Sequence, residues 1–281
     1  MGLLRMAPKR SPSFLRLCFL VLIALTSYAT AESASISAAH ELPPQSKPID
    51  EVLVPVPREV FASLNKFANS NWVRVQCRGL PKWKPRGDQA QIALLLGAVI
   101  AEGFIAVEAK DKDQVKNIGS AVLKLASAIG VKESVLRRSS AIVEDAERSD
   151  WNAVREEWDG VFADVEVAMR EVESEQLSQL VSLGGWLRGT EALTALILQN
   201  YPTDEAELLR QPASLDYFDR HITKMNRELR SKALVAKMQQ GIRRIRPLVR
   251  SDGRARLSEK TVKEIGAITK ELVEELDVKS R

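Results

Sequence analysis

Residues 174–200 limit the fold of this chain more than any other segment, because they have helical spacing and apolar side chains on nearly every side. A helix that is apolar all round lies at the centre of a protein. The segment nevertheless contains Gly184, Gly185 and Gly189, and each interior glycine costs about 1 kcal/mol relative to alanine. We expect the close approach of a second helix to offset this cost, since glycine has no Cβ atom.

Residues 88–109 are the natural partner of this helix, because they are also apolar and contain Gly97 and Gly103. We therefore predict that two central helices cross where Gly97 meets Gly184. The prediction fails if the two glycines lie far apart, or if either helix is mostly exposed to water.

Both predicted central helices carry charges among their apolar residues: Glu102 in the first, and Arg188 and Glu191 in the second. A buried charge without a partner is strongly destabilising, so these groups must be paired or open to water. In the structural interpretation, Arg188 pairs with Glu102 or Glu191 and fixes the helix crossing.

A functional interpretation of the same charges stays open. In it, a cleft between residues 88–109 and 174–200 holds a small anionic ligand, with the guanidinium of Arg188 on a carboxylate or phosphate group. The candidate ligand-binding residues are Arg188, Glu102, Glu191 and Trp186.

Helical periodicity also dominates the remainder of the chain, and strand-like alternation is nearly absent. Helix-capping residues, glycines and prolines fall mostly at the boundaries between segments. The expected helices are 57–68, 88–109, 113–129, 132–147, 150–172, 174–200, 203–210, 213–223, a long helix ending near Arg246 and Pro247, and 258–276. We therefore predict an all-α fold of eight to ten helices, either a multi-helix bundle or stacked helical hairpins.

The N-terminus has the pattern of a secretory signal peptide over residues 1–31. A basic stretch precedes an apolar run from Leu17 to Thr26, and Ala29 and Ala31 form a small-residue exit. The run is shorter than the roughly 20 residues that span a bilayer. We expect cleavage after Ala31, a secreted or periplasmic protein and no stable membrane span afterwards; the alternative is an uncleaved anchor.

The expected mature chain begins with a Pro-, Ser- and Ala-rich tether over residues 32–54, followed by a single helical domain over residues 55–281. The chain has 41 Lys and Arg and 37 Asp and Glu. The signal peptide removes four cations and no acid, which leaves a formally neutral protein. Neither this balance nor export favours a nucleic-acid partner.

Cysteine usage agrees with an apolar core as the source of stability. Removal of the signal peptide leaves Cys77 as the one cysteine, so no internal disulfide is available. Cys77 lies between Arg74 and Arg78, which would lower its pKa if they approach the thiol. The alternative is a partly buried, unreactive thiol.

The charges of the neutral chain are unevenly distributed. Residues 144–175 carry 12 acids and three bases, and residues 224–256 carry 11 bases and two acids. One interpretation is that these are two solvated helix faces that lie against each other. The other is that residues 224–256 bind an anionic partner, such as a phospholipid headgroup, an acidic wall polymer or an acidic protein.

Three motifs occur in a fixed order: "LLLGAVIAEGFIAVEA" (94–109), "VLKLASAIGV" (122–131) and "LVSLGGWLRGTEALTAL" (180–196). This order resembles a group of uncharacterised secreted, all-helical bacterial proteins, over about residues 90–200. The resemblance implies an exported helical fold and transfers no catalytic residue. The chain lacks the tyrosines of that group's first helix.

Signatures of catalysis are sparse. No metal-binding His or Cys spacing, nucleophile elbow, P-loop or dinucleotide fingerprint occurs, so no catalytic residue, metal or cofactor is predicted. Tyr217 and His221 share one helix face, which fits a haem or acid–base pair less well than an ordinary covering helix. The predicted function is an exported, non-catalytic interaction or binding module. The alternatives are the small-anion binder described above and a hydrolase whose acids cannot be picked out.

Overall fold

The computed structural model describes residues 47–49, 52–54, 65–67, 70–77, 85, 87–172, 174–250 and 256–276. The predicted signal peptide and most of the predicted tether lie outside these residues. So do all but three residues of the predicted helix 57–68.

The all-α fold class is confirmed, with nine α-helices in the described part of the chain. These are α2 (Gln89–Glu108), α3 (Lys112–Ala128), α4 (Lys132–Glu147), α5 (Trp151–Glu171), α6 (Glu175–Gln199), α7 (Pro212–Lys224), α8 (Arg227–Arg230), α9 (Ala233–Val249) and α10 (Glu259–Glu275). Short 3-10 turns are η1 (Asn65–Phe67), η2 (Trp72–Arg74) and η4 (Asp204–Leu209).

A small antiparallel hairpin precedes the helices, at the end of the segment predicted to be an extended tether. Strand β1 (Lys47–Ile49) pairs with β2 (Val52–Val54), with Lys47 opposite Val54. These six residues are the described part of the predicted tether, and they pair with each other as strands. Asp50 and Glu51 alone separate them, which is the length of a tight hairpin connection.

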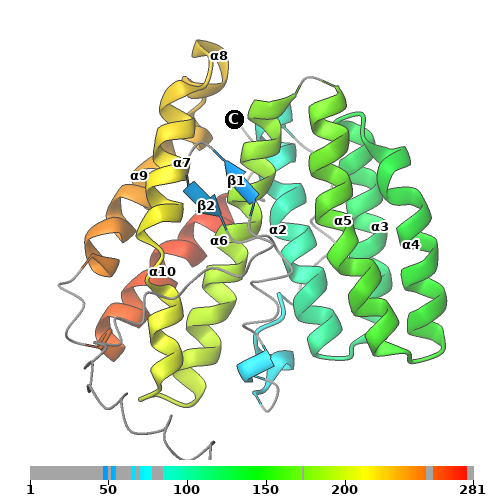
Figure 1. Cartoon of the computed structure of the whole chain (residues 1–281), viewed down its shortest axis with the longest axis horizontal. Coiled ribbons are helices and arrows are strands. Elements are labelled where there is room, and N and C mark those ends of the chain that lie inside the picture. The colour runs from blue at the N-terminus through cyan, green and yellow to red at the C-terminus, as the bar shows by residue number, and fades with distance from the viewer. Residues whose placement is uncertain are drawn as a thin grey trace, which may run out of the picture. The chain divides into compact units, whose positions relative to one another are not determined.

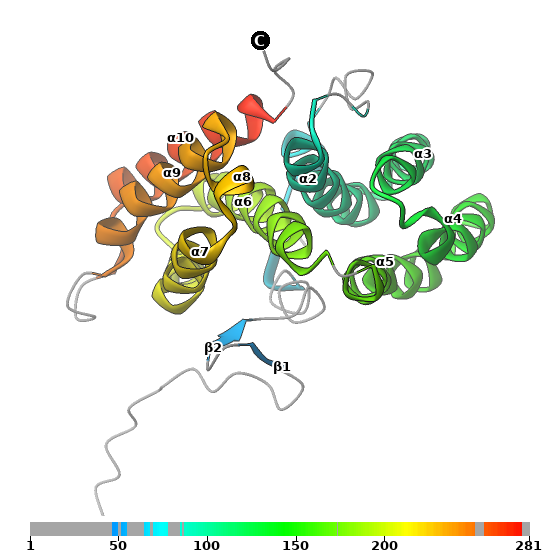
Figure 2. The same cartoon turned by 90° about the horizontal axis from the view of Figure 1, so that it is seen from above.

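Helices α2 and α6 lie at the centre of the helical unit (Figure 1). Helices α3, α4 and α5 follow one another on one side of this pair, and α7, α9 and α10 lie on the other side (Figure 2). Successive helices contact each other in the pairs α2–α3, α3–α4 and α4–α5, while α10 returns to pack on α6. The buried apolar residues form one continuous core cluster across both sides.

Local sequence sets most helix boundaries. Asp88 begins α2 by accepting a hydrogen bond from the backbone N–H of Gln91, and Asp150 begins α5 in the same way. Both aspartates are N-caps, because a short side-chain acceptor satisfies an N–H group that lacks a helical partner. Gly130 follows α3 with a φ of +82°, the left-handed conformation in which a helix commonly ends.

One predicted boundary is wrong. The long helix was expected to end near Pro247, but α9 continues to Val249 with Pro247 in its last turn. Val249 is buried in the core, and Arg250 just beyond it pairs with Asp216 of α7. These contacts hold the turn in spite of the hydrogen bond that proline cannot donate.

The predicted crossing of the two glycine-containing helices is confirmed. A Cβ atom on Gly97 would overlap the carbonyl oxygen of Val181, and one on Gly184 would overlap that of Leu94. The backbones therefore touch at these positions, and neither position has room for a side chain. A Cβ atom on Gly103 would overlap the indole ring of Trp158, so this glycine makes room for a buried side chain.

Helix α2 is the single described helix that is long and apolar enough to cross a bilayer. All of its apolar stretch is buried by neighbouring helices. This is the behaviour of a core helix in a folded domain, and length and composition alone do not distinguish the two roles.

The crossing gives a prediction with a matched control on the same helix. Gly97→Ala and Gly184→Ala are each expected to lower the free energy of unfolding by about 3 kcal/mol, because the new methyl group meets backbone that cannot move aside. Gly189 has no atom within contact distance of its Cβ position. Gly189→Ala should therefore be neutral or stabilise the protein by up to about 1 kcal/mol.

Urea denaturation of the three variants measures these changes. Equal loss of stability in all three would show that helix propensity or the wider surroundings, and not backbone contact, governs these positions.

Candidate functional site

An ion pair between Arg188 of α6 and Glu102 of α2 lies beneath the surface next to the helix crossing. Both side chains are only 1% exposed. Arg188 Nε donates to Glu102 Oε2 at 2.8 Å, and its Nη2 lies 2.6 Å from the same oxygen. The predicted pairing between the two central helices is therefore present.

The rest of the guanidinium is also occupied. Its Nη2 donates to the backbone carbonyl of Val75 at 2.5 Å, and its Nη1 donates to Glu191 at 3.3 Å. A guanidinium has five N–H donors, and these contacts use Nε, Nη1 and Nη2. The geometry therefore favours the structural interpretation of Arg188, because each of its three nitrogens already has a protein partner.

The ion pair also fastens a third piece of chain, residues 70–77, to the central helices. The backbone N–H of Cys77 donates to Glu102 Oε1 at 2.7 Å, so both carboxylate oxygens have partners. Further along, Asn71 and Gln199 exchange two hydrogen bonds between backbone and side-chain amide. The buried Trp72 anchors the same segment. We call residues 70–77 the strap.

Burial and charge act in opposite directions on the ionisable groups of this site. Burial raises the pKa of Glu102 above its ordinary value, although the Arg188 charge lowers it. Burial also disfavours the charged form of Arg188, but the carboxylates of Glu102 and Glu191 outweigh this effect and raise its pKa. Arg188 is therefore a fixed positive charge that holds the strap and both central helices together.

Cys77 is not the activated thiol that its neighbours in sequence suggested. Burial raises its pKa to about 12, against the lowering effect of Arg188. Arg74 is exposed and is not a cause of the shift. The alternative interpretation, an unreactive and partly buried thiol, matches the structure.

Trp186 lies apart from the ion pair. Its indole N–H donates to Gln211 at 2.8 Å, and its ring centroid is 5.7 Å from that of Phe218 on α7. Positions 186 and 188 are separated by about 200° around a helix. Of the four candidate residues, the structure thus brings together Arg188, Glu102 and Glu191, while Trp186 serves the contact between α6 and α7.

The geometry does not favour a ligand cleft between α2 and α6. Their backbones are in contact at the glycines, and Arg188 is buried. Two surface pockets lie elsewhere: one between the beginning of α6 and the end of α7, and one between residues 66–70 and the end of α6. Neither is lined by Arg188 or Glu102.

Over most of their length the two charge-rich segments do not lie against each other, so that part of the first interpretation is wrong; only their ends meet, where Glu175 and Lys224 line one pocket. Figure 2 places α5 and α9 on opposite sides of the central helices. Each segment finds its partners nearby: Glu157 and Asp164 of α5 pair with Arg138 of α4. The cations of α9 pair with acids of α7 and α10, in the pairs Arg243–Asp219, Arg246–Asp216, Lys237–Glu275 and Arg244–Glu271.

Within the residues that the structure describes, no group of three or more His, Cys, Asp and Glu side chains is placed to hold a metal ion. The rings of Tyr217 and His221 are in contact, with centroids 4.1 Å apart and the ring planes tilted by 44°. Both are buried on α7.

Comparison of the chain with protein-family models, with curated proteins and with solved structures finds no match.

The strap and the pocket between α6 and α7 are the features that the sequence did not reveal. The strap binds mainly through backbone atoms of Val75 and Cys77, which leave no pattern of residue types. The pocket had one signal, since His221 shares a helix face with Tyr217, but its other walls come from residues near 175 in the sequence.

Removal of the buried charge tests the structural role. Arg188→Ala should lower the free energy of unfolding by about 3–5 kcal/mol, because Glu102 is left buried without a countercharge. Replacing both residues by leucine should recover part of this loss, since no charge is then buried. Urea denaturation measures both variants. The functional interpretation would gain if small carboxylates or phosphate stabilised the unmodified protein but not Arg188→Ala.

The thiol of Cys77 gives a second test. With a pKa of about 12, its thiolate fraction near pH 8 is about a thousandfold below that of an exposed cysteine. In a chain carrying Cys18→Ser, alkylation by iodoacetamide should be slow in the folded protein and fast in urea. Rapid alkylation of the folded protein would contradict a buried, neutral thiol.

Proposed function

We propose that the protein is an exported, non-catalytic helical interaction module, and that it binds an anionic partner through the arginines of α8. The exported state follows from the sequence pattern of residues 1–31 and stays a prediction. The observation that supports an anionic partner is that the cations of residues 224–256 differ in whether they form ion pairs. Most of them pair with neighbouring acids, whereas Arg227 and Arg230 of α8 are directed to solvent.

The basic segment divides into two parts. Along α9, the cations are used in ion pairs with α7 and α10, which stabilise the packing of these helices. Along residues 224–232, four cations accompany one acid. Lys232 pairs with Asp88, and one N–H group of Arg230 binds the carbonyl of Thr223. The remaining donors of Arg230 and the Arg227 side chain are exposed.

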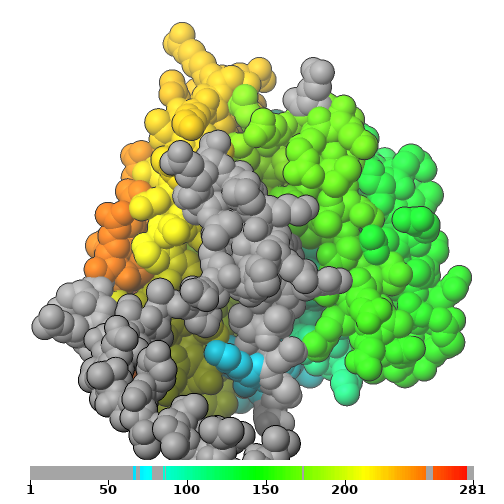
Figure 3. Space-filling view, in the orientation of Figure 1, coloured from blue at the N-terminus to red at the C-terminus, as the bar shows by residue number. Residues whose placement is uncertain are grey.

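Helix α8 is also well placed for contact with a large partner. It projects beyond the neighbouring ends of α6 and α7 (Figure 1), and in the space-filling view its atoms form the protrusion at the top (Figure 3). A short projecting helix with exposed arginines can approach a flat, negatively charged surface without steric conflict from the remainder of the helical unit. Anionic phospholipid headgroups are the partner that this geometry favours.

Binding to phosphatidylglycerol vesicles tests the proposal. Arg227→Gln combined with Arg230→Gln should weaken binding by about 2 kcal/mol, or about thirtyfold, because each arginine near an anionic surface contributes about 1 kcal/mol. Added salt should weaken binding of the unmodified protein, and vesicles of phosphatidylcholine alone should bind poorly.

A matched control removes two exposed cations from α4, with Lys132→Gln and Arg137→Gln. Figure 2 shows α4 on the far side of the helical unit from α9. The control should bind the vesicles as the unmodified protein does. Equal losses in the two double variants would mean that net charge, and not α8, determines binding. Full binding by the α8 variant would overturn the proposal.

A further inference from the structure

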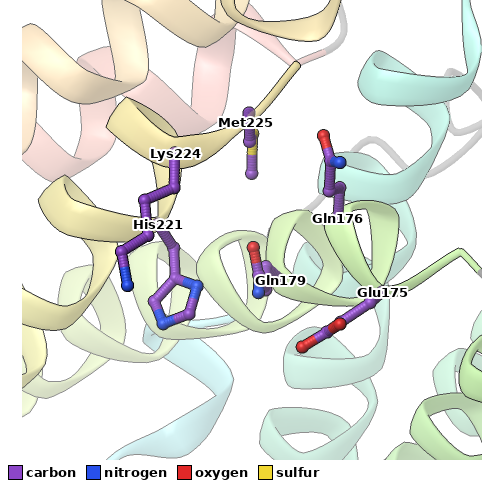
Figure 4. A pocket seen from close by; sticks show the side chains of 6 residues that line it. All are labelled: Glu175, Gln176, Gln179, His221, Lys224 and Met225. Carbon is purple, nitrogen blue, oxygen red and sulfur yellow. The ribbon is translucent and has the colours of Figure 1, made fainter. Parts of the chain in front are cut away.

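A pocket of about 200 Å³ lies between the first turns of α6 and the last turn of α7. Its lining is polar apart from Met225. Figure 4 shows the six side chains that surround it, which are Glu175, Gln176, Gln179, His221, Lys224 and Met225.

We propose that this pocket binds a small zwitterion of amino-acid size, with its ammonium group at Glu175 and its carboxylate at Lys224 and His221. The inference is independent of the vesicle-binding surface, since it uses neither arginine of α8. Its support comes from the size of the pocket, the distribution of charge over its walls, and the amide groups that line it.

The volume limits the ligand to a small molecule. A cavity of about 150 Å³ accommodates benzene, which has six heavy atoms. The pocket is somewhat larger and is open on one side, so it fits an amino acid and leaves a longer side chain in solvent. A nucleotide or an oligosaccharide is too large to be enclosed by it.

The charge on the walls favours a ligand that carries both signs. Glu175 stands on the α6 wall, while Lys224 and His221 stand on the α7 wall. A simple anion in this space would meet the carboxylate of Glu175, and a simple cation would meet the ammonium of Lys224. A zwitterion satisfies both walls at once, because each of its charged groups faces one of opposite sign.

Helix electrostatics alone account for part of this arrangement. A carboxylate in the first turn of a helix and a cation in the last turn are each favourable with the helix dipole, and Glu175 and Lys224 occupy these positions. This explanation does not account for the amides between them. Those amides distinguish a binding site from two ordinary helix ends.

One of the two amide side chains in the pocket, Gln179, has hydrogen-bonding groups that the described part of the protein does not use. Gln176 Oε1 accepts from the backbone N–H of Asn226 at 3.0 Å, which ties the two walls together. Gln179 has no hydrogen-bond partner among the described residues. In Figure 4 its amide lies between His221 and Glu175. A ligand carboxylate or ammonium at this position would have an amide donor and acceptor within reach.

His221 is held in place from behind. It is 7% exposed, and its ring contacts that of Tyr217 in a tilted arrangement, with centroids 4.1 Å apart and an interplanar angle of 44°. The restriction of the imidazole lowers the entropy lost when a ligand binds. Tyr217, which shares a helix face with His221, therefore positions the imidazole for ligand binding.

Titration calorimetry of the full chain with the twenty common L-amino acids tests the proposal. At least one is expected to bind saturably, with a 1:1 stoichiometry. For L-alanine the matched half-ligands are propionate, which lacks the ammonium group, and ethylammonium, which lacks the carboxylate. Each half-ligand should bind at least about tenfold more weakly than the zwitterion, since each loses one charged contact.

Three variants of the pocket sharpen the test. Gln179→Leu should weaken amino-acid binding at least about tenfold. Glu175→Gln should shift the preference of the pocket toward propionate, and Lys224→Met should shift it toward ethylammonium. Glu156→Gln, at an exposed position on α5, is the control and should leave binding unchanged. Thermal melting of all four variants should match the unmodified protein, because the altered side chains are at the surface or at the pocket rim.

Two outcomes would overturn the proposal. In the first, no amino acid of the panel binds. In the second, binding persists in both Glu175→Gln and Lys224→Met, or propionate binds as well as L-alanine, which would mean a general anion site or a site elsewhere. Loss of vesicle binding in the α8 variant with intact amino-acid binding would separate the two proposals.

Discussion

The contact between α2 and α6 is the constraint on which the remaining structure depends. Gly97 and Gly184 allow the two backbones to touch, and this closeness brings Arg188 within reach of Glu102. The pair in turn supplies the oxygen and nitrogen atoms that hold Val75 and Cys77. Small residues, a buried charge and the position of the preceding strap therefore form one connected arrangement, in which each part requires the others.

Much of this arrangement could be predicted from the sequence. Some of its signals depend only on neighbouring residues, and others are buried charges with few possible partners. Asp88 and Asp150 are recognised as caps from their own neighbourhoods. Charges within two apolar helices have few partners besides each other, so the sequence predicts a pair of Arg188 with Glu102 or Glu191, and the structure contains both contacts. Three predictions failed for another reason: the place of Trp186 in the site, the last residue of α9, and the ion-pair partners of the acidic segment. Each of these depends on which helices become neighbours. Spacing within one helix does not contain that information.

The charged surface illustrates the same limit. A count of residues gives two strongly charged segments of opposite sign, which suggests that they attract each other. The fold separates them over most of their length, and several charges of each pair with closer partners such as Arg138 on α4 and Asp216 and Asp219 on α7. What distinguishes Arg227 and Arg230 of α8 is that neither forms an ion pair within the described structure, although Glu228 lies between them in the sequence. Which charges stay exposed and unpaired is thus decided by the fold, and the net charge of a sequence segment does not predict it.

The order of the chain gives the α2–α6 contact a consequence during synthesis. The ribosome completes α2 at Glu108, then makes α3, α4 and α5, and begins α6 only at Glu175. Until then, a membrane-length apolar helix carries a carboxylate whose counterion has not yet been made. The nascent protein therefore passes through a stage at which it resembles a bilayer-inserting segment, and a chaperone that shields such segments would have its clearest substrate in this interval.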